Sequence, residues 1–137
     1  MVELSKEKVA KLQKYSACDF LSRLPWPVSP ETPASIIAPI STVQFISKSD
    51  ALPQIAQDDP EHHGFPEGTH WVDHTQRDTI VLLDQPEDQK CAILGGIMSA
   101  RMSAIGAKAA LVNGRVRDMA ELRAVGLPVR ITIRVKE

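Results

Sequence analysis

Cysteine, aromatic residues and net charge are all scarce in this sequence. Of its 137 residues only two are cysteines, aromatic residues make up 4%, and the formal net charge is −1. Two cysteines cannot build a disulfide framework, so Cys18 and Cys91 are predicted to be reduced, buried thiols. A nearly neutral chain without a long Lys/Arg run lacks the concentrated positive field of a nucleic-acid groove. The composition therefore argues against a disulfide scaffold and against a nucleic-acid-binding protein.

Long hydrophobic runs are missing as well. The apolar stretches fall far short of the roughly 20 residues that cross a membrane. Residues 1–15 are charged and patterned as an amphipathic helix, which is not the pattern of a signal peptide. We therefore expect a cytoplasmic chain that does not enter membranes. A length of 137 residues predicts one domain, 1–137, with a single core.

The apolar pattern predicts an alternation of helices and strands, which is typical of an α/β fold. Prolines interrupt residues 24–34, so this segment is predicted to be a stiff surface connection. The other expected elements, in chain order, are a helix at 3–15, a short helix opening at Ser16, strands at 36–38 and 42–46, a polar loop at 47–70 with a short helix at 51–57, a strand at 78–84, a helix after Gly95-Gly96, a strand at 109–112, a turn of positive φ at 113–114, a helix at 118–125 and a strand at 129–135.

The Gly95-Gly96 turn and the residues after the strand at 109–112 together suggest a binding site. Glycines let the backbone approach a ligand closely, and free amides at a helix N-terminus attract a carboxylate or phosphate. Arg117 and Asp118 lie just past a predicted strand end, where α/β folds usually place ligands. With Glu121, these residues combine an anion cradle, a guanidinium and two carboxylates. Such a set is typical of a site for a small acid and a metal ion.

The spacing of these residues resembles a motif of a known family. Gly96 is followed by twenty residues, then Arg117-Asp118, two further residues and Glu121. This pattern is similar to that of the RraA-like family, which contains the regulator of ribonuclease activity A and the divalent-metal 4-hydroxy-4-methyl-2-oxoglutarate aldolases. The strings at 95–101 and 112–118 also resemble the family, as does the segment at 16–20.

The resemblance implies a more specific fold than the residues alone predict. It implies a compact β-barrel-like sheet of the swivelling β/β/α type, flanked by helices and assembled into homo-oligomers, trimers or hexamers. Family members continue well beyond the position of Pro128-Val129, so the C-terminal part of the fold is expected to be reduced here.

The aldolases of the family also imply a reaction. It is the cleavage of a 4-hydroxy-2-oxo dicarboxylic acid to pyruvate and a second carbonyl compound, with oxaloacetate decarboxylation as the related reaction. Both reactions pass through the pyruvate enolate, whose charge a divalent ion such as Mg²⁺ or Mn²⁺ stabilises. Asp118 is the expected metal ligand, directly or through a water, because a hard oxygen donor suits these ions.

The same resemblance gives the other site residues their expected roles. Arg117 would clamp the keto-acid end of a small 2-oxo acid and offset charge on its oxygen. Glu121 would orient water at the ion or move a proton. The catalytic residues are thus Arg117, Asp118 and Glu121, and the substrate-binding residues are Arg117 and the amides of Gly95, Gly96, Ile97 and Met98.

Each of these features also has a purely structural interpretation. Asp118 could cap the helix that follows it, with Glu121 completing a capping box. Four histidines at positions 62, 63, 70 and 74 could ligate a metal, and the last two have i, i+4 spacing. Glycines and a proline interrupt that segment, so a solvated loop is favoured. Cys91 could be a nucleophile, but buried packing is favoured because no histidine is placed in sequence to activate it.

A different class of function stands beside the lyase. The namesake of the family inhibits ribonuclease by protein contact, and such members tend to lack the acidic residue that Glu121 supplies here. The shortened C-terminal part instead favours a non-catalytic or repurposed member, such as a protein-binding regulator or a tailoring protein for another oxo or enol substrate. Metal dependence through Asp118 separates the two classes.

Overall fold

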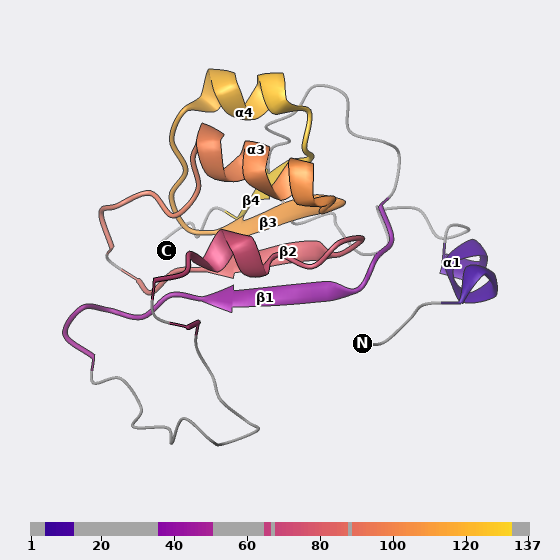
Figure 1. Cartoon of the computed structure of the whole chain (residues 1–137), viewed down its shortest axis with the longest axis horizontal. Helices are drawn as coiled ribbons and strands as arrows, with labels where there is room; N and C mark the ends of the chain where they lie inside the picture. The colour runs from indigo at the N-terminus through magenta and orange to yellow at the C-terminus, as the bar shows by residue number, and fades with distance from the viewer. Residues whose placement is uncertain (1–4, 13–35, 51–64, 67, 88, 133–137) are drawn as a thin grey trace, which may run out of the picture.

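Four short strands make up the sheet of this computed structural model, which describes residues 5–12, 36–50, 65–66, 68–87 and 89–132. The elements in chain order are α1 (Lys6–Leu12), β1 (Ile40–Gln44), the 3-10 helix η1 (Trp71–His74), β2 (Ile80–Asp84), α3 (Gly96–Ile105), β3 (Ala109–Asn113), α4 (Met119–Val125) and β4 (Val129–Ile131) (Figure 1). None of the described helices is long and apolar enough to cross a membrane.

The strands are all parallel and follow one another across the sheet in the order β1-β2-β3-β4. Crossovers between neighbouring parallel strands are right-handed, so successive crossovers that step in one direction place their helices on one face. Figure 1 shows α3 and α4 together on one side of the sheet, and the two helices contact each other. The alternating α/β architecture expected from the sequence is therefore confirmed.

The core lies between this face of the sheet and the two helices. The strand register aligns Val81 of β2 with Ala110 of β3, and Leu83 with Val112. These four side chains are all buried. Because side chains alternate between the faces of a strand, residues two apart share one face, and here that face is the covered one. Met102, Leu122 and Leu94 are the largest fully buried side chains outside the strands.

The first strand is displaced from its predicted position. Residues 36–38 are irregular, and β1 covers Ile40–Gln44 in place of 42–46. A strand exists only where a partner strand lies beside it, and the Ile80 N–H donates to the Pro39 carbonyl at 2.8 Å where the pairing with β2 begins. At the other end, the Phe45 N–H donates to the Asp84 carbonyl at 2.9 Å. The apolar run at 36–38 therefore lies before the point where pairing with β2 begins, so it does not form a strand.

Two local predictions are wrong. Gly114 does not have positive φ; the described residues with positive φ are Gly68, Gly106, Gly126, Asp78 and Asp118. The role of Gly114 is space, because an added Cβ would lie 2.7 Å from the Gln85 Oε1. Cys91 is exposed, not buried. It lies in the connection between β2 and α3, outside the helices and strands.

Some predictions lie partly or wholly outside the described residues. The N-terminal helix is confirmed for Lys6–Leu12, and the last strand for Val129–Ile131. The short helices at Ser16 and at 51–57, the proline-rich connection at 24–34, and Cys18 fall on residues that are not described. The four described strands form a parallel sheet, and its closure into a barrel stays a prediction.

Candidate functional site

Two loops run side by side at the carboxyl ends of the strands. One joins β2 to α3 and the other joins β3 to α4. The Ile93 N–H donates to the Arg115 carbonyl at 2.9 Å, and the Arg117 N–H donates to the Leu94 carbonyl at 3.0 Å. Leu94 and Val116 form a parallel bridge between these bonds. This short pairing places the Gly95-Gly96 turn next to the residues that follow Val116.

Asp118 uses this proximity to reach the N-terminus of α3. Its Oδ2 accepts a hydrogen bond from the Gly96 N–H at 3.2 Å and lies 3.7 Å from the Arg117 Nε. Negative charge is favourable at a helix N-terminus because free amides and the helix dipole both attract it. The Asp118 side chain remains 42% exposed. The carboxylate is therefore held on one oxygen while the residue stays accessible to solvent.

The capping alternative for the Asp118 side chain is wrong. Asp118 is the residue before α4, and its carbonyl accepts the Leu122 N–H at 2.9 Å, but its side chain makes no capping bond to that helix. Its backbone is left-handed, with φ 56° and ψ 51°. Non-glycine residues adopt this conformation rarely, and such strain collects at functional sites. The strained backbone directs the carboxylate across to α3.

Both glycines of the turn are required for space. A Cβ added at Gly95 would lie 2.7 Å from the Asp118 Oδ2, and one at Gly96 would lie 2.6 Å from the Glu121 Cβ. Neither glycine has positive φ. Their missing side chains thus allow Asp118 and Glu121 to pack directly on the backbone at the start of α3.

The fold therefore brings together the residues that the spacing singled out. Glu121 is exposed, and the stem of its side chain packs on Gly96. The Arg117 side chain is 72% exposed beside Asp118. In the first turn of α3, Ile97 is exposed and Met98 is half-buried against the core. One predicted detail differs. The Gly96 amide was expected to bind the substrate, but here it donates to the Asp118 carboxylate.

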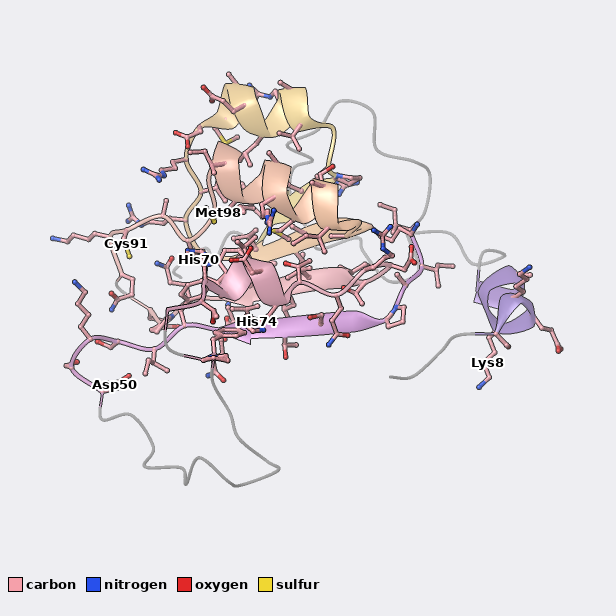
Figure 2. All side chains as sticks on the ribbon, viewed as in Figure 1. Lys8, Asp50, His70, His74, Cys91 and Met98 are labelled. Carbon is pink, nitrogen blue, oxygen red and sulfur yellow. The ribbon has the colours of Figure 1, made fainter. Side chains whose placement is uncertain are left out.

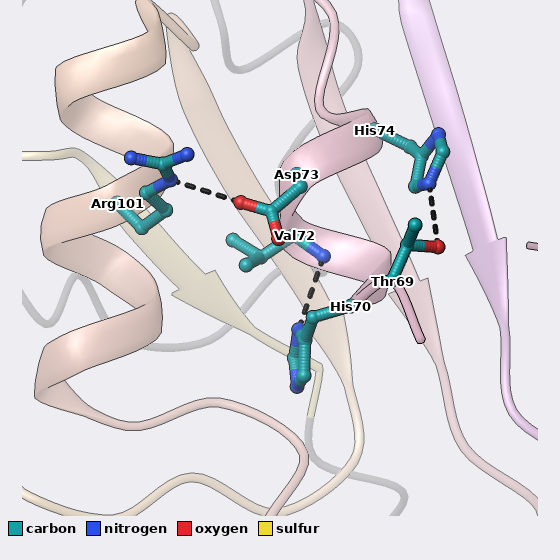
Figure 3. Close-up of polar contacts among 6 residues, drawn as sticks. All are labelled: Thr69, His70, Val72, Asp73, His74 and Arg101. Carbon is teal, nitrogen blue, oxygen red and sulfur yellow. Dashed lines mark hydrogen bonds and ion pairs between the residues drawn. The ribbon is translucent and has the colours of Figure 1, made fainter. Parts of the chain in front are cut away.

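The histidine-rich segment has a structural role where it is described. His70 Nδ1 accepts the Val72 N–H at 3.2 Å and so caps η1, while the His74 ring bonds to the Thr69 hydroxyl at 3.0 Å (Figure 3). The Arg101 guanidinium of α3 pairs with Asp73 of η1 at 3.0 Å. Within the described ranges, no group of three or more His, Cys, Asp or Glu could hold a metal ion. His62 and His63 lie outside those ranges.

Gln85 is a residue of this region that the sequence interpretation missed. It follows β2 directly, is only 7% exposed, and bonds through its side chain to both loops. Cys91, one of its partners, lies at the end of the molecule where the strands end (Figure 2). The available signal was a polar side chain placed immediately after the most apolar strand.

Comparison of the sequence with known protein families identifies the family. A family model described as RraA-like, Aldolase/RraA, matches residues 17–136. The chain belongs to the RraA-like family. The family includes aldolases and other lyases as well as regulators, so membership of this RraA-like protein is compatible with either class.

A solved structure supports the RraA-like fold. It is that of Streptomyces coelicolor RraAS2, described as an unusual member of the RNase ES inhibitor RraA protein family. The two chains are 20% identical with a TM-score of 0.61, and the alignment covers 96% of this chain and 65% of that one. At this identity the likeness shows the fold alone.

A further solved structure is described as that of novel cellulases from microbes associated with the gut ecosystem. It is 31% identical over 47% of this chain and 29% of that one, with a TM-score of 0.42, which is too low to support an argument. None of the curated proteins matches the sequence significantly.

Proposed function

We propose that this RraA-like protein is a divalent-metal-dependent lyase for small 2-oxo acids. Its reaction would be retro-aldol cleavage of 4-hydroxy-4-methyl-2-oxoglutarate-type substrates to pyruvate, oxaloacetate decarboxylation, or both. The observation that supports it most is the position of Asp118. Its exposed carboxylate lies beside the Arg117 guanidinium at the N-terminus of α3. An acid, a cation and free helix amides thus converge where a small anionic substrate and a metal ion would meet.

The oxygen donors around Asp118 suit a hydrated Mg²⁺ or Mn²⁺. Both contacts of the Asp118 carboxylate use Oδ2, which leaves Oδ1 for an ion or for water bound to it. Mg²⁺ usually keeps several waters and needs only one or two carboxylates. The lack of a third ligating side chain within the described ranges is compatible with such a site. When bound, the ion would supply the positive charge that stabilises a developing enolate.

The neighbouring residues would bind the substrate and move its proton. Arg117 is engaged at Nε only, so its remaining N–H groups can bind the carboxylate or keto oxygen of a 2-oxo acid. The first-turn amides of Ile97 and Met98 have no intrahelical acceptor, as at any helix N-terminus, and would donate to the same substrate anion. Glu121, fixed by its packing on Gly96, would orient water or transfer a proton.

A protein-binding regulator, or a tailoring protein for another oxo or enol substrate, is the second candidate. The observation that favours it is apolar exposure at the rim of the site. Ile97 is 78% exposed and Met119 is 37% exposed, next to the cradle and to Asp118 respectively. Exposed apolar side chains mark a protein contact where they form a continuous patch. A contact between copies of the chain would use the same surface, so these side chains do not exclude the lyase.

We also propose that the protein is cytoplasmic, that it assembles into trimers or hexamers, and that its sheet closes in a barrel-like manner. Light scattering coupled to size-exclusion chromatography measures the number of copies directly. A monomer at micromolar concentration would contradict this part of the proposal.

The proposal predicts that the charge of Asp118 is essential. Asp118→Asn keeps an oxygen that can accept the Gly96 N–H, and Asn tolerates left-handed backbone. The substitution removes the negative charge and replaces the other carboxylate oxygen, the one left for the ion, by an NH2 group. We expect metal-dependent pyruvate release, measured as kcat/KM, to fall by about a hundredfold or more, as for loss of an electrostatic group at a reacting centre.

Asp78→Asn is the matched control for this variant. Asp78 also has left-handed backbone, with φ 61°, and is exposed. It pairs with Lys108 at 2.8 Å before the start of β2, at the opposite end of that strand from the site. The hydrogen bond from Lys108 holds the pKa of the Asp78 carboxyl below its ordinary value. Turnover should be unchanged in Asp78→Asn. Retention of turnover in Asp118→Asn would refute the site.

A further inference from the structure

Gln85 connects the two loops of the site at their base. Its Oε1 accepts the Arg115 N–H at 3.0 Å, and its Nε2 donates to the Cys91 carbonyl at 2.8 Å. Cys91 belongs to the loop before α3 and Arg115 to the loop before α4. Gln85 itself is fixed to β3, because its N–H donates to the Asn113 carbonyl at 2.9 Å. One buried side chain thus joins the sheet to both loops.

Beyond Gln85 the two loops stay paired as far as the candidate site. The Ile93–Arg115 and Leu94–Arg117 backbone bonds follow in order along the loops. The bond from the Gly96 N–H to the Asp118 carboxylate closes the far end. Only three residues separate Cys91 from Gly95, and only two separate Arg115 from Asp118. A change in the alignment of the two loops at Gln85 would therefore also move the Asp118 carboxylate relative to the Gly95-Gly96 turn.

The environment of Gln85 fixes the direction of its amide. The oxygen faces a backbone donor and the nitrogen faces a backbone acceptor, so a reversed amide would place like groups together. The space is also narrow, because a Cβ added at Gly114 would lie 2.7 Å from the Gln85 Oε1 and 2.8 Å from its Cβ. A buried polar group needs its partners, and their loss leaves donors and acceptors unpaired. Gln85 is thus a specific clamp, not a space-filling residue.

We propose that Gln85 is a positioning residue for the site: it sets the register of the two loops and so holds the Asp118 carboxylate at the N-terminus of α3. Gln85 would not touch substrate or metal, and it would act through Asp118. This inference rests on the function proposed for Asp118. The bonds that hold a metal-ligating group in place typically change metal affinity or activity by about tenfold to a hundredfold when they are removed.

The test compares Gln85→Met with two controls. Methionine has a similar length but removes every hydrogen bond of the amide. Thr79→Val is the stability control, because Thr79 is buried at the other end of β2 and its hydroxyl donates to the Gln76 carbonyl at 2.8 Å. Cys91→Ala removes only the thiol, which lies 3.5 Å from the Gln85 Nε2, and keeps the backbone carbonyl.

Two readouts separate positioning from general stability. The first is the amide chemical shift and hydrogen exchange of Gly96 and Arg115, measured by NMR with the Val81 amide of β2 as the internal reference. The second is the Mg²⁺ concentration that gives half-maximal pyruvate release. In Gln85→Met we expect faster exchange at Gly96 and Arg115 but not at Val81, and an Mg²⁺ requirement raised about tenfold to a hundredfold. Thr79→Val and Cys91→Ala should change neither readout.

Gln85→Asn keeps the test decisive if the methionine variant does not fold. Its amide is one methylene too short to span both partners, so it should give a milder form of the same changes. The inference would be overturned if the Gln85 variants had the same Gly96 amide exchange rate and the same Mg²⁺ requirement as Thr79→Val. If the unmodified protein releases no pyruvate, the proposed function fails on its own. The exchange measurement then still decides whether Gln85 positions the two loops.

Discussion

Asp118 unites the features on which the candidate site depends. Its left-handed backbone costs about 1–2 kcal/mol relative to an ordinary conformation. In return its carboxylate contacts the first amide of α3 and the Arg117 guanidinium, 22 residues and one residue away in sequence. Strain of this kind persists only where the surrounding structure fixes the residue. The pairing of the two loops supplies that fixation.

Gly96→Ala tests the close packing at this site. The new Cβ would lie 2.6 Å from the Glu121 Cβ, so α4 must move away from α3. We expect a loss of about 1–3 kcal/mol in the free energy of unfolding, as for other overpacked positions, together with reduced turnover. Urea unfolding and pyruvate release measure the two effects.

Gly126→Ala is the control for Gly96→Ala. Gly126 has φ 74° at the end of α4, and an added Cβ would meet nothing within 4 Å. It should lose about 1 kcal/mol through backbone strain alone, with turnover unchanged. If Gly96→Ala behaves like this control, with full turnover, the close contact between Gly96 and Glu121 has no functional consequence.

At this scale the sequence spacing predicted which residues meet but not how they meet. The set of Gly96, Arg117, Asp118 and Glu121 is brought together as expected. The direction of the Asp118 carboxylate was not predictable from local preferences, because a residue in that position usually caps its own helix. Its actual partner depends on the pairing of two loops, which is a tertiary contact.

At the scale of single elements, the apolar pattern was sufficient where a strand is buried and flanked by helices. β2, β3 and α4 lie within a residue or two of their predicted bounds, and α3 begins at the Gly95-Gly96 turn as predicted. β1 is shifted because its limits depend on where β2 begins and ends, which no local pattern shows. Gln85 was missed for a similar reason, since its partners are backbone atoms of two distant loops.

Ser99→Ala tests the packing of α3. Ser99 shares the buried face of α3 with Gly96 and Met102. Its hydroxyl is buried without a hydrogen-bond partner in the part of the chain that the structure describes. Alanine removes the unpaired group and is a better helix former, so we expect a gain of about 1 kcal/mol in the free energy of unfolding.

Ser103→Ala, at an exposed position of the same helix, measures the contribution of helix propensity alone. Its free energy of unfolding should rise by only about half a kcal/mol. Thermal and urea unfolding of both variants give the comparison. A loss of stability in Ser99→Ala would show that the hydroxyl has a partner and would contradict the interpretation of this position.

For the whole molecule, the family match and the parallel sheet agree with the alternating α/β architecture that the sequence predicts. The match covers residues 17–136, and the similarity to the RraAS2 fold extends over 96% of the chain. The residues alone indicate only the alternating α/β part, and barrel-like closure and the oligomer number, which the resemblance implies, stay predictions. Catalysis is a further step, because the family includes both lyases and regulators.

Metal removal is the most direct test of the central claim, that Asp118 and Arg117 form a metal-dependent lyase site. The measurement is pyruvate release by the unmodified protein from 4-hydroxy-4-methyl-2-oxoglutarate and from oxaloacetate, with Mg²⁺, with Mn²⁺ and with excess chelator. Reactions without protein are subtracted, because divalent ions alone decarboxylate oxaloacetate. We expect turnover with either ion, its loss in chelator and its recovery when the ion is restored. A folded protein that releases no pyruvate, or that is indifferent to chelator, would contradict the claim.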